Sequence, residues 1–129
     1  MYIIKVGGGS KINLEGVALD LAAIEEPFLV VLGANALRDQ LGQRLGQEKV
    51  QLTSVSGYSS VFSDADGVDL IMMAYSGLSN RRFVEMCQKV GVNAVGLTGL
   101  DGRLIQGRRN RGIKVRQNGK TMVKRDFSG

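Results

Sequence analysis

The chain has 129 residues, 43% of them hydrophobic, which predicts a single soluble globular domain with its own core rather than a disordered segment. It contains no histidine and one cysteine, so Ser-His and Cys-His nucleophiles and an internal disulfide are excluded, and no metal site is expected. No apolar run approaches the roughly 18 residues of a membrane span, and there is no signal-peptide pattern, so we expect a cytoplasmic protein.

The charge is distributed unevenly along the sequence. Residues 1–102 carry eight lysines and arginines against eleven acidic residues, a net charge of −3. Residues 103–129 carry nine against Asp126 alone, a net charge of +8. The basic character therefore belongs to one segment near the carboxyl end, which predicts a partner surface rather than a property of the fold.

Two units of strand, glycine turn and helix are predicted in the first third of the sequence. The predicted elements are strand 2–6, helix 14–22, strand 28–32 and helix 36–45. Asn13 offers a cap for the first helix, and the continuous apolar run of the second strand is typical of a strand covered on both faces. This order predicts a parallel α/β fold, in which the turns after both strands face one crevice.

The remaining elements are shorter and end in a C-terminal β-hairpin region. They are a hairpin or flap over 51–62, one broken or two separate helices over 65–90, a third buried strand over 93–97, and short strands at 104–105, 113–116 and 121–123. Asn118-Gly119 is a typical two-residue hairpin turn before the last of these strands. The apolar row of Val68, Ile71, Met72 and Tyr75 favours core packing over an oligomer interface.

Lys5 and the glycines that follow it form the most informative local pattern. Glycine amides can approach phosphate oxygens closely because no Cβ intervenes, and a nearby ammonium neutralises their charge. The pattern lacks the rest of a Walker motif, which points away from P-loop proteins. An ordinary structural turn is the more frequent explanation of such a segment, and it stays open beside the phosphate site.

Four segments resemble the amino acid kinase family, and in particular its acetylglutamate kinase branch. They are Lys5-Val6-Gly7-Gly8, the turn at Gly33, Ser56-Gly57-Tyr58-Ser59-Ser60, and the run Asn93-Ala94-Val95-Gly96-Leu97-Thr98-Gly99-Leu100-Asp101-Gly102. The resemblance covers the whole chain in order, and the last run is its most specific part. Within the branch, Leu100 and the third segment look more like the kinases whose substrate, aminoadipate or glutamate, is held on a small acidic carrier protein in lysine and arginine biosynthesis.

The resemblance implies a three-layer α/β sandwich with a mainly parallel central sheet, and phosphorylation of a side-chain carboxylate by ATP. Lys5 would be the catalytic residue and would stabilise the transferring phosphoryl group. The amides of Gly7 and Gly8 would bind phosphate. Those of Gly33 and Ala34 would bind the acceptor substrate. Such a transfer relies on positioning and charge neutralisation, and a carboxylate is already ionised at neutral pH, so the missing histidine base is no obstacle.

The same resemblance gives the basic segment a partner, because it would dock the acidic carrier protein and set its orientation. The docking candidates are Arg103, Arg108, Arg109, Arg111, Lys114 and Arg116. Two alternatives stay open: a solvated basic face without a partner, and a nucleic-acid surface. The lack of aromatic residues among these arginines disfavours nucleic acid.

Three positions depart from the family pattern. Leu32 and Ala34 stand where the second turn usually has a histidine and a glycine. Val61 stands where family members carry an arginine that grips the α-carboxylate of the substrate. The absence of this arginine removes a charge-assisted anchor for the substrate worth roughly 1.5–3 kcal/mol.

Family members also continue, beyond the segment matching residues 125–129, into a nucleotide-binding half. We therefore expect residues 1–129 to form a single acceptor-substrate lobe, and ATP and Mg²⁺ to act only with a separate nucleotide-binding chain. The isolated chain would then not turn over ATP. Three functions stay open: such a kinase lobe, a non-catalytic carrier-binding or dimerising relative, and a basic nucleic-acid-binding protein. The resemblance also implies a homodimer through the helix that carries Val68, Met72 and Tyr75.

Overall fold

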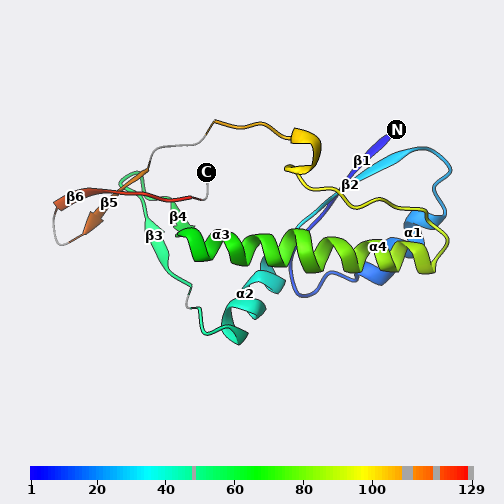
Figure 1. Cartoon of the computed structure of the whole chain (residues 1–129), viewed down its shortest axis with the longest axis horizontal. Coiled ribbons are helices and arrows are strands. Elements are labelled where there is room, and N and C mark those ends of the chain that lie inside the picture. Colours follow the sequence, from blue (N-terminus) through cyan, green and yellow to red (C-terminus); the bar gives the residue numbers. More distant parts are fainter. Residues whose placement is uncertain (48, 109–111, 118–119, 128–129) are drawn as a thin grey trace.

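A long helical rod organises the molecule (Figure 1). The computed structural model describes residues 1–47, 49–108, 112–117 and 120–127. The rod consists of α3 (Ala65–Met72), the π-helical segment η1 (Met73–Ser79) and α4 (Asn80–Lys89), which follow one another directly. The break predicted within the helical region 65–90 is therefore a change of helix type. No helix in the described part of the chain is long and apolar enough to cross a membrane.

Local chemistry sets both ends of the rod. Asp64 caps its start, because Oδ1 accepts a hydrogen bond from the amide of Gly67 at 2.9 Å. Gly91 lies just past its end with a φ of +84°, a conformation that glycine adopts without strain.

The amino-terminal elements match the predicted order. They are β1 (Tyr2–Val6), α1 (Leu14–Ala22), β2 (Phe28–Leu32) and α2 (Asn35–Arg44). The two strands pair in parallel, with Tyr2 opposite Phe28 and Val6 opposite Leu32. Asn13 caps α1 by accepting the amide of Gly16 at 3.0 Å. The four predicted elements are confirmed, each within one residue of its expected bounds.

The core lies between α1, α4 and one face of this two-stranded sheet. Its buried members are Ala18 and Leu21 of α1 and Phe83 and Cys87 of α4. Ile4, Phe28, Val30 and Leu32 pack against them from the sheet. Burial raises the pKa of the Cys87 thiol, which fits a structural rather than a reactive cysteine.

The other face of the sheet is exposed, so the prediction that the second strand is covered on both faces was wrong. Ile3, Leu29 and Val31 point away from the core and are exposed, because α1 and α4 cover only the opposite face. Each sheet in the described part of the chain has two strands. The structure is thus a mixed α/β arrangement of small sheets, and a three-layer sandwich with a central parallel sheet is not confirmed.

Residues 93–97 were predicted as a third buried strand, and this was also wrong. The segment runs beside α4 without strand pairing among the described residues, and Val95 is 80% exposed. Side chains of α4 bind its carbonyls in place of a neighbouring strand. Asn80 Nδ2 donates to Leu97 O at 2.9 Å, Arg81 Nη2 to Gly96 O at 3.0 Å, and Gln88 Nε2 to Ala94 O at 3.2 Å.

Two antiparallel hairpins lie beyond the start of the rod (Figure 1). They are formed by β3 (Gln51–Thr53) with β4 (Ser59–Val61), and by β5 (Ile113–Gln117) with β6 (Lys120–Lys124). Both hairpins confirm the prediction, although the turn predicted at 118–119 lies outside the described residues. The amide of Val55 donates to Lys114 O at 2.9 Å and joins the two hairpins.

The short strand expected at 104–105 is absent from the described structure. A 3₁₀ turn, η2 (Asp101–Arg103), precedes residues 104–105 and continues into a compact loop. The amide of Leu104 donates to Asp101 O and that of Ile105 to Gly99 O, so the backbone of both residues is used in turns. Local turn bonds therefore compete successfully with strand formation here.

Candidate functional site

The glycine turns after β1 and β2 lie in direct contact at the carboxyl edge of the sheet. The amide of Gly33 donates to Val6 O at 2.9 Å, and that of Ala36 donates to Gly8 O at 2.8 Å. A Cβ on Gly8 would lie 2.5 Å from the nitrogen of Ala34, and one on Gly33 would lie 2.6 Å from the nitrogen of Gly8. Only glycine permits this approach, so Gly8 and Gly33 are required for packing as well as for any ligand.

The backbone amide nitrogens of Gly8, Ala34 and Asn35 come close together where the two turns meet. The amides of Gly8, Ala34 and Asn35 donate to no residue that the structure describes. Ala34 is the N-cap of α2 and its side chain supplies no capping bond, so the positive end of the helix dipole adds to these donors. This arrangement suits an oxyanion.

Ala34 fits its position without backbone strain. Its φ of −144° is accessible to any residue, and the residue is buried. The methyl group that replaces the usual glycine therefore does not distort the turn.

Lys5 lies near the end of β1, two residues before Gly7, on the exposed face of the sheet. It pairs in register with Val31 of β2, which shares that face. Lys5 is exposed and makes no ion pair with a described residue, so its ammonium is not committed to a structural carboxylate.

Tyr75 of η1 reaches the same region, which the sequence did not indicate. Its hydroxyl donates to Oδ1 of Asn35, the first residue of α2, at 2.5 Å. The side chain was predicted in the apolar row of the third helix, but the π-helical segment changes the register of that row. Tyr75 thereby fixes the side chain of Asn35 next to the converging amides.

A cleft of about 820 Å³ lies between the second half of α2, the end of β4 and the start of α3. Its apolar wall includes Val61, Phe62 and Leu70, and its polar wall includes Arg38, Asp39 and Lys49. Val61 is the position where the family pattern expects an arginine. The predicted residues Lys5, Gly7, Gly8, Gly33 and Ala34 do not line this cleft.

A carboxylate bridges two cations at the polar wall. Asp39 Oδ1 accepts from Arg38 at 2.6 Å and Oδ2 accepts from Lys49 at 3.0 Å. Partial burial acts to raise the pKa of Asp39, but hydrogen bonds from Arg38 and Lys49 and their charges outweigh it and lower the pKa. Sequence reasoning missed this group because its members carry no motif.

The run over residues 93–102 has a structural role in the described chain. Thr98 donates to Asp101 Oδ2 through its amide at 2.6 Å and through Oγ1 at 2.9 Å. These two hydrogen bonds lower the pKa of Asp101, and the bond from the backbone amide has the larger effect. Asp101 therefore closes the turn that leads into the basic segment.

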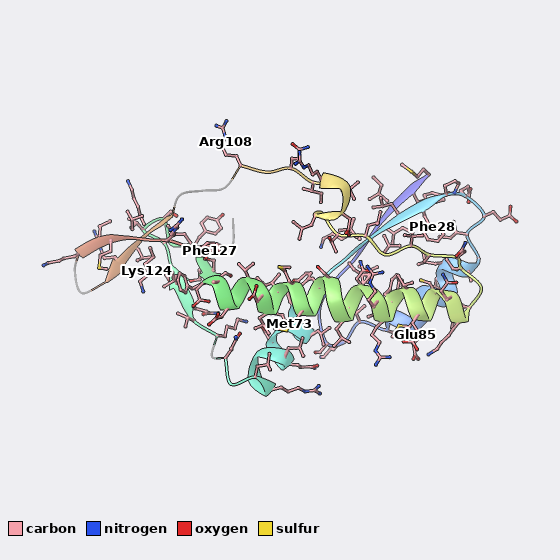
Figure 2. All side chains as sticks on the ribbon, in the orientation of Figure 1. Phe28, Met73, Glu85, Arg108, Lys124 and Phe127 are labelled. Atoms are coloured by element: carbon pink, nitrogen blue, oxygen red, sulfur yellow. The ribbon has the colours of Figure 1, made fainter. Side chains whose placement is uncertain are left out.

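The described members of the basic segment are exposed. Lys114 and Arg116 lie on one face of β5 while Val115 between them is buried, as strand alternation requires. Arg103 is exposed in η2, and Arg108 projects away from the ribbon (Figure 2). Arg109 and Arg111 lie outside the described residues. The described cations of this group make no ion pair with another described residue.

Comparison with known proteins identifies relatives in one class. The chain is 41% identical, over an alignment of 133 positions, to a [LysW]-aminoadipate kinase of Thermus thermophilus, covering 100% of this chain and 49% of the relative. It is 38% identical to the [LysW]-aminoadipate kinase of Deinococcus radiodurans, covering 100% of this chain and 46% of that protein. A [LysW]-aminoadipate/[LysW]-glutamate kinase of Saccharolobus islandicus is 33% identical, over 95% of this chain and 47% of the relative. No family model matches the chain.

These relatives are kinases, the class that the glycine turns and the run over residues 93–102 resemble. The chain is a homologue of the [LysW]-aminoadipate and [LysW]-glutamate kinases. It spans about half the length of the curated relatives it matches.

Proposed function

We propose that this chain is the acceptor-substrate half of a kinase that phosphorylates the side-chain carboxylate of aminoadipate or glutamate held on an acidic carrier protein. The main support is the 41% identity to a [LysW]-aminoadipate kinase over the whole of this chain. The converging amides of Gly8, Ala34 and Asn35 add a site of suitable chemistry.

In the proposed reaction an oxygen of the substrate carboxylate attacks the γ-phosphorus of ATP. The new bond joins this oxygen to phosphorus, and the bond between phosphorus and the β,γ-bridging oxygen breaks, so ADP leaves. No general base is required, because the carboxylate is ionised at neutral pH. Lys5 and the converging amides would neutralise the oxyanions, and the nucleotide-binding half of the kinase would supply ATP and Mg²⁺.

The basic segment would bind the carrier protein. Arg103, Arg108, Lys114 and Arg116 are exposed cations without a partner among the described residues, which suits an acidic surface. The remaining candidates, Arg109 and Arg111, belong to the same proposal by sequence.

A second candidate function is a non-catalytic relative that binds the carrier or dimerises. Val61 favours it, because an isopropyl group lines the cleft at the position of the expected arginine. The two candidates differ in whether the chain can complete a kinase when its partner half is supplied.

A complementation assay separates them. The purified chain is incubated with MgATP and carrier-linked aminoadipate, alone and with the separately expressed other half of the Thermus thermophilus relative, and hydroxylamine traps acyl phosphate. We expect hydroxamate only in the mixture, and loss of most of the signal in Lys5→Met. Turnover by the chain alone would contradict the half-enzyme proposal. A folded chain that stays inactive in the mixture would favour the non-catalytic relative.

A further inference from the structure

Strands β1 and β2 present an apolar outer face on the side of the sheet away from the core. We define this outer face by Ile3, Leu29 and Val31, which are 72%, 48% and 46% exposed. We propose that the outer face is the docking surface for the nucleotide-binding half of the kinase, which lies over it and reaches Lys5 from there. This inference deepens the proposed function and rests on it, because it assumes that a nucleotide-binding half completes the site.

The composition of β2 indicates that a second layer covers the sheet. Parallel strands occur almost only in sheets that are covered on both faces, and their sequences are then apolar throughout. All five residues of β2 are apolar. Val30 and Leu32 pack against the core, whereas Leu29 and Val31 are exposed on the other side. The layer that would cover Leu29 and Val31 therefore has to come from outside the described residues.

The segment over residues 93–97 adds apolar side chains that point in the same general direction. Ala94 packs against the same core as the inner residues of the sheet, and a Cβ on Gly96 would meet the side chain of Asn80 on α4. Val95 and Leu97 alternate with Ala94 and Gly96, so they point away from α4, and both are exposed. A set of apolar side chains that face away from the core in this way is typical of a protein–protein contact.

The position of Lys5 indicates which partner covers the outer face. Lys5 lies on this side of the sheet beside Val31, its register partner, and makes no ion pair with a described residue. In the proposed reaction the γ-phosphate of ATP reaches this ammonium and the converging amides at the carboxyl edge of the same sheet. A partner that covers Ile3 and Leu29 and continues along the strands to Lys5 would bring the nucleotide to that edge. The chain matches about half the length of its relatives, which leaves them a second half of similar size for this role.

Two other occupants fit the outer face less well. A second copy packed face to face would bury the Lys5 ammoniums of both copies in an apolar contact. None of the residues of β1 and β2 is acidic, so these strands offer no carboxylate to pair with the buried charges. The acidic carrier is expected on the basic segment, whose described cations lie in η2, in the loop after it and on β5 rather than on this sheet.

Thiol labelling tests the docking surface. Leu29→Cys places a thiol on the outer face, and the native Cys87 is buried, so the rate of labelling by a maleimide reports the new site. The 129-residue chain alone is compared with a fusion in which the other half of the Thermus thermophilus relative follows its carboxyl end. We expect Leu29→Cys to be labelled about tenfold more slowly in the fusion than in the chain alone. Leu19→Cys, at an exposed position of α1, is the matched control and should be labelled at rates within about twofold of each other in the two proteins.

A binding measurement decides the matter if the fusion does not fold. The separately expressed half is titrated onto the immobilised chain, and the affinity is measured by biolayer interferometry. Leu29→Lys should weaken binding about tenfold, because it places a charge in an apolar contact, whereas Leu19→Lys should leave the affinity unchanged. Equal affinities for the two variants would overturn the docking surface.

The outcomes of labelling separate this inference from the proposed function. A fusion that forms acyl phosphate while Leu29→Cys stays unprotected would overturn the docking surface and leave the kinase function standing. A folded fusion that protects Leu29→Cys but forms no acyl phosphate would support the docking surface and contradict the kinase function. A folded fusion with neither property would overturn both. Protection in the chain alone that is lost on dilution would assign the outer face to a second copy and overturn the inference as well.

Discussion

The side-chain oxygen of Asn80 occupies the space where a side chain on Gly96 would begin. A Cβ built on Gly96 would lie 1.9 Å from Asn80 Oδ1 and 2.9 Å from Val84 Cγ2. Asn80 Oδ1 is buried and has no hydrogen-bond partner in the described part of the chain, while Nδ2 of the same side chain binds Leu97 O. The pair fixes the segment over residues 93–97 against α4.

Gly96→Ala should therefore detach this segment and destabilise the chain. The methyl group cannot fit without moving Asn80, and overpacking of this kind costs about 1–3 kcal/mol. Urea unfolding measures the change. Gly107→Ala is the matched control, because no described residue lies within 4 Å of a Cβ at Gly107. The double variant Asn80→Ala/Gly96→Ala should be less destabilised than the sum of its single changes, and strict additivity would show that the two residues do not contact.

Gly8→Ala should affect both stability and anion binding. The added Cβ would lie 2.5 and 2.6 Å from the backbone nitrogens of Ala34 and Asn35, and backbone atoms cannot rotate away as a side chain can. We expect a loss of about 1–3 kcal/mol and no measurable binding of N-acetylglutamate. Gly9→Ala, where a Cβ would meet no atom of the described chain within 4 Å, should change neither property. Equal melting temperatures for the two variants would show that the glycine turns are not packed as described.

The sequence predicts the strand–helix order well where the signal is local. Asn13, the apolar spacing of α1 and the run over residues 28–32 each determine their element within a few positions. The prediction of a strand over residues 93–97 fails because the apolar composition of this segment resembles a strand, whereas its actual partners are side chains of the preceding helix α4, such as Asn80. Pairing of that kind depends on three-dimensional proximity, which periodicity does not encode.

The candidate site likewise has one part that the sequence predicts and another that it does not. The contact of the two glycine turns follows from parallel strand order, so sequence indicates it. The positions of Tyr75 and Arg38 cannot be predicted from the sequence. That of Tyr75 depends on a π-helical register, and that of Arg38 on a cleft formed by three separate elements.

Acid should destabilise the turn at Asp101. The folded pKa of this carboxyl is lowered by hydrogen bonds from Thr98, so its contribution is present above the unfolded pKa of about 3.9 and is lost as pH falls through the lower folded pKa. Asp101→Asn should therefore be less stable than wild type near neutral pH, and the difference should shrink towards acid. Urea midpoints across this range measure it. Asp20→Asn, at an exposed position of α1, is the matched control, and a difference for Asp101→Asn that grows in acid would contradict the assignment.

Charge reversal on β5 tests carrier docking. Lys114→Glu/Arg116→Glu should weaken binding to an acidic carrier protein and reduce its salt dependence, because two exposed cations on one strand face become anions. Fluorescence anisotropy at several salt concentrations measures this. Lys11→Glu, an exposed lysine before α1, serves as the control. Equal affinity for carrier and duplex DNA, with a steep salt slope for both, would favour the nucleic-acid alternative.

Met72 and Met73 provide a matched test of the proposed homodimer. Both are 45% exposed on adjacent positions of the rod, but neighbouring helical residues point in clearly different directions, about 100° apart in a regular α-helix. If the row of Val68, Met72 and Tyr75 forms the contact, Met72→Lys places a charge in an apolar interface and should convert the dimer to a monomer, whereas Met73→Lys should not. Sedimentation velocity at tens of micromolar distinguishes the two states. A wild-type chain that sediments as a monomer would remove the dimer proposal. A wild-type dimer that both variants leave intact would assign the contact to another surface, and the exposed face of β1 and β2, with Ile3, Leu29 and Val31, would be the next to test.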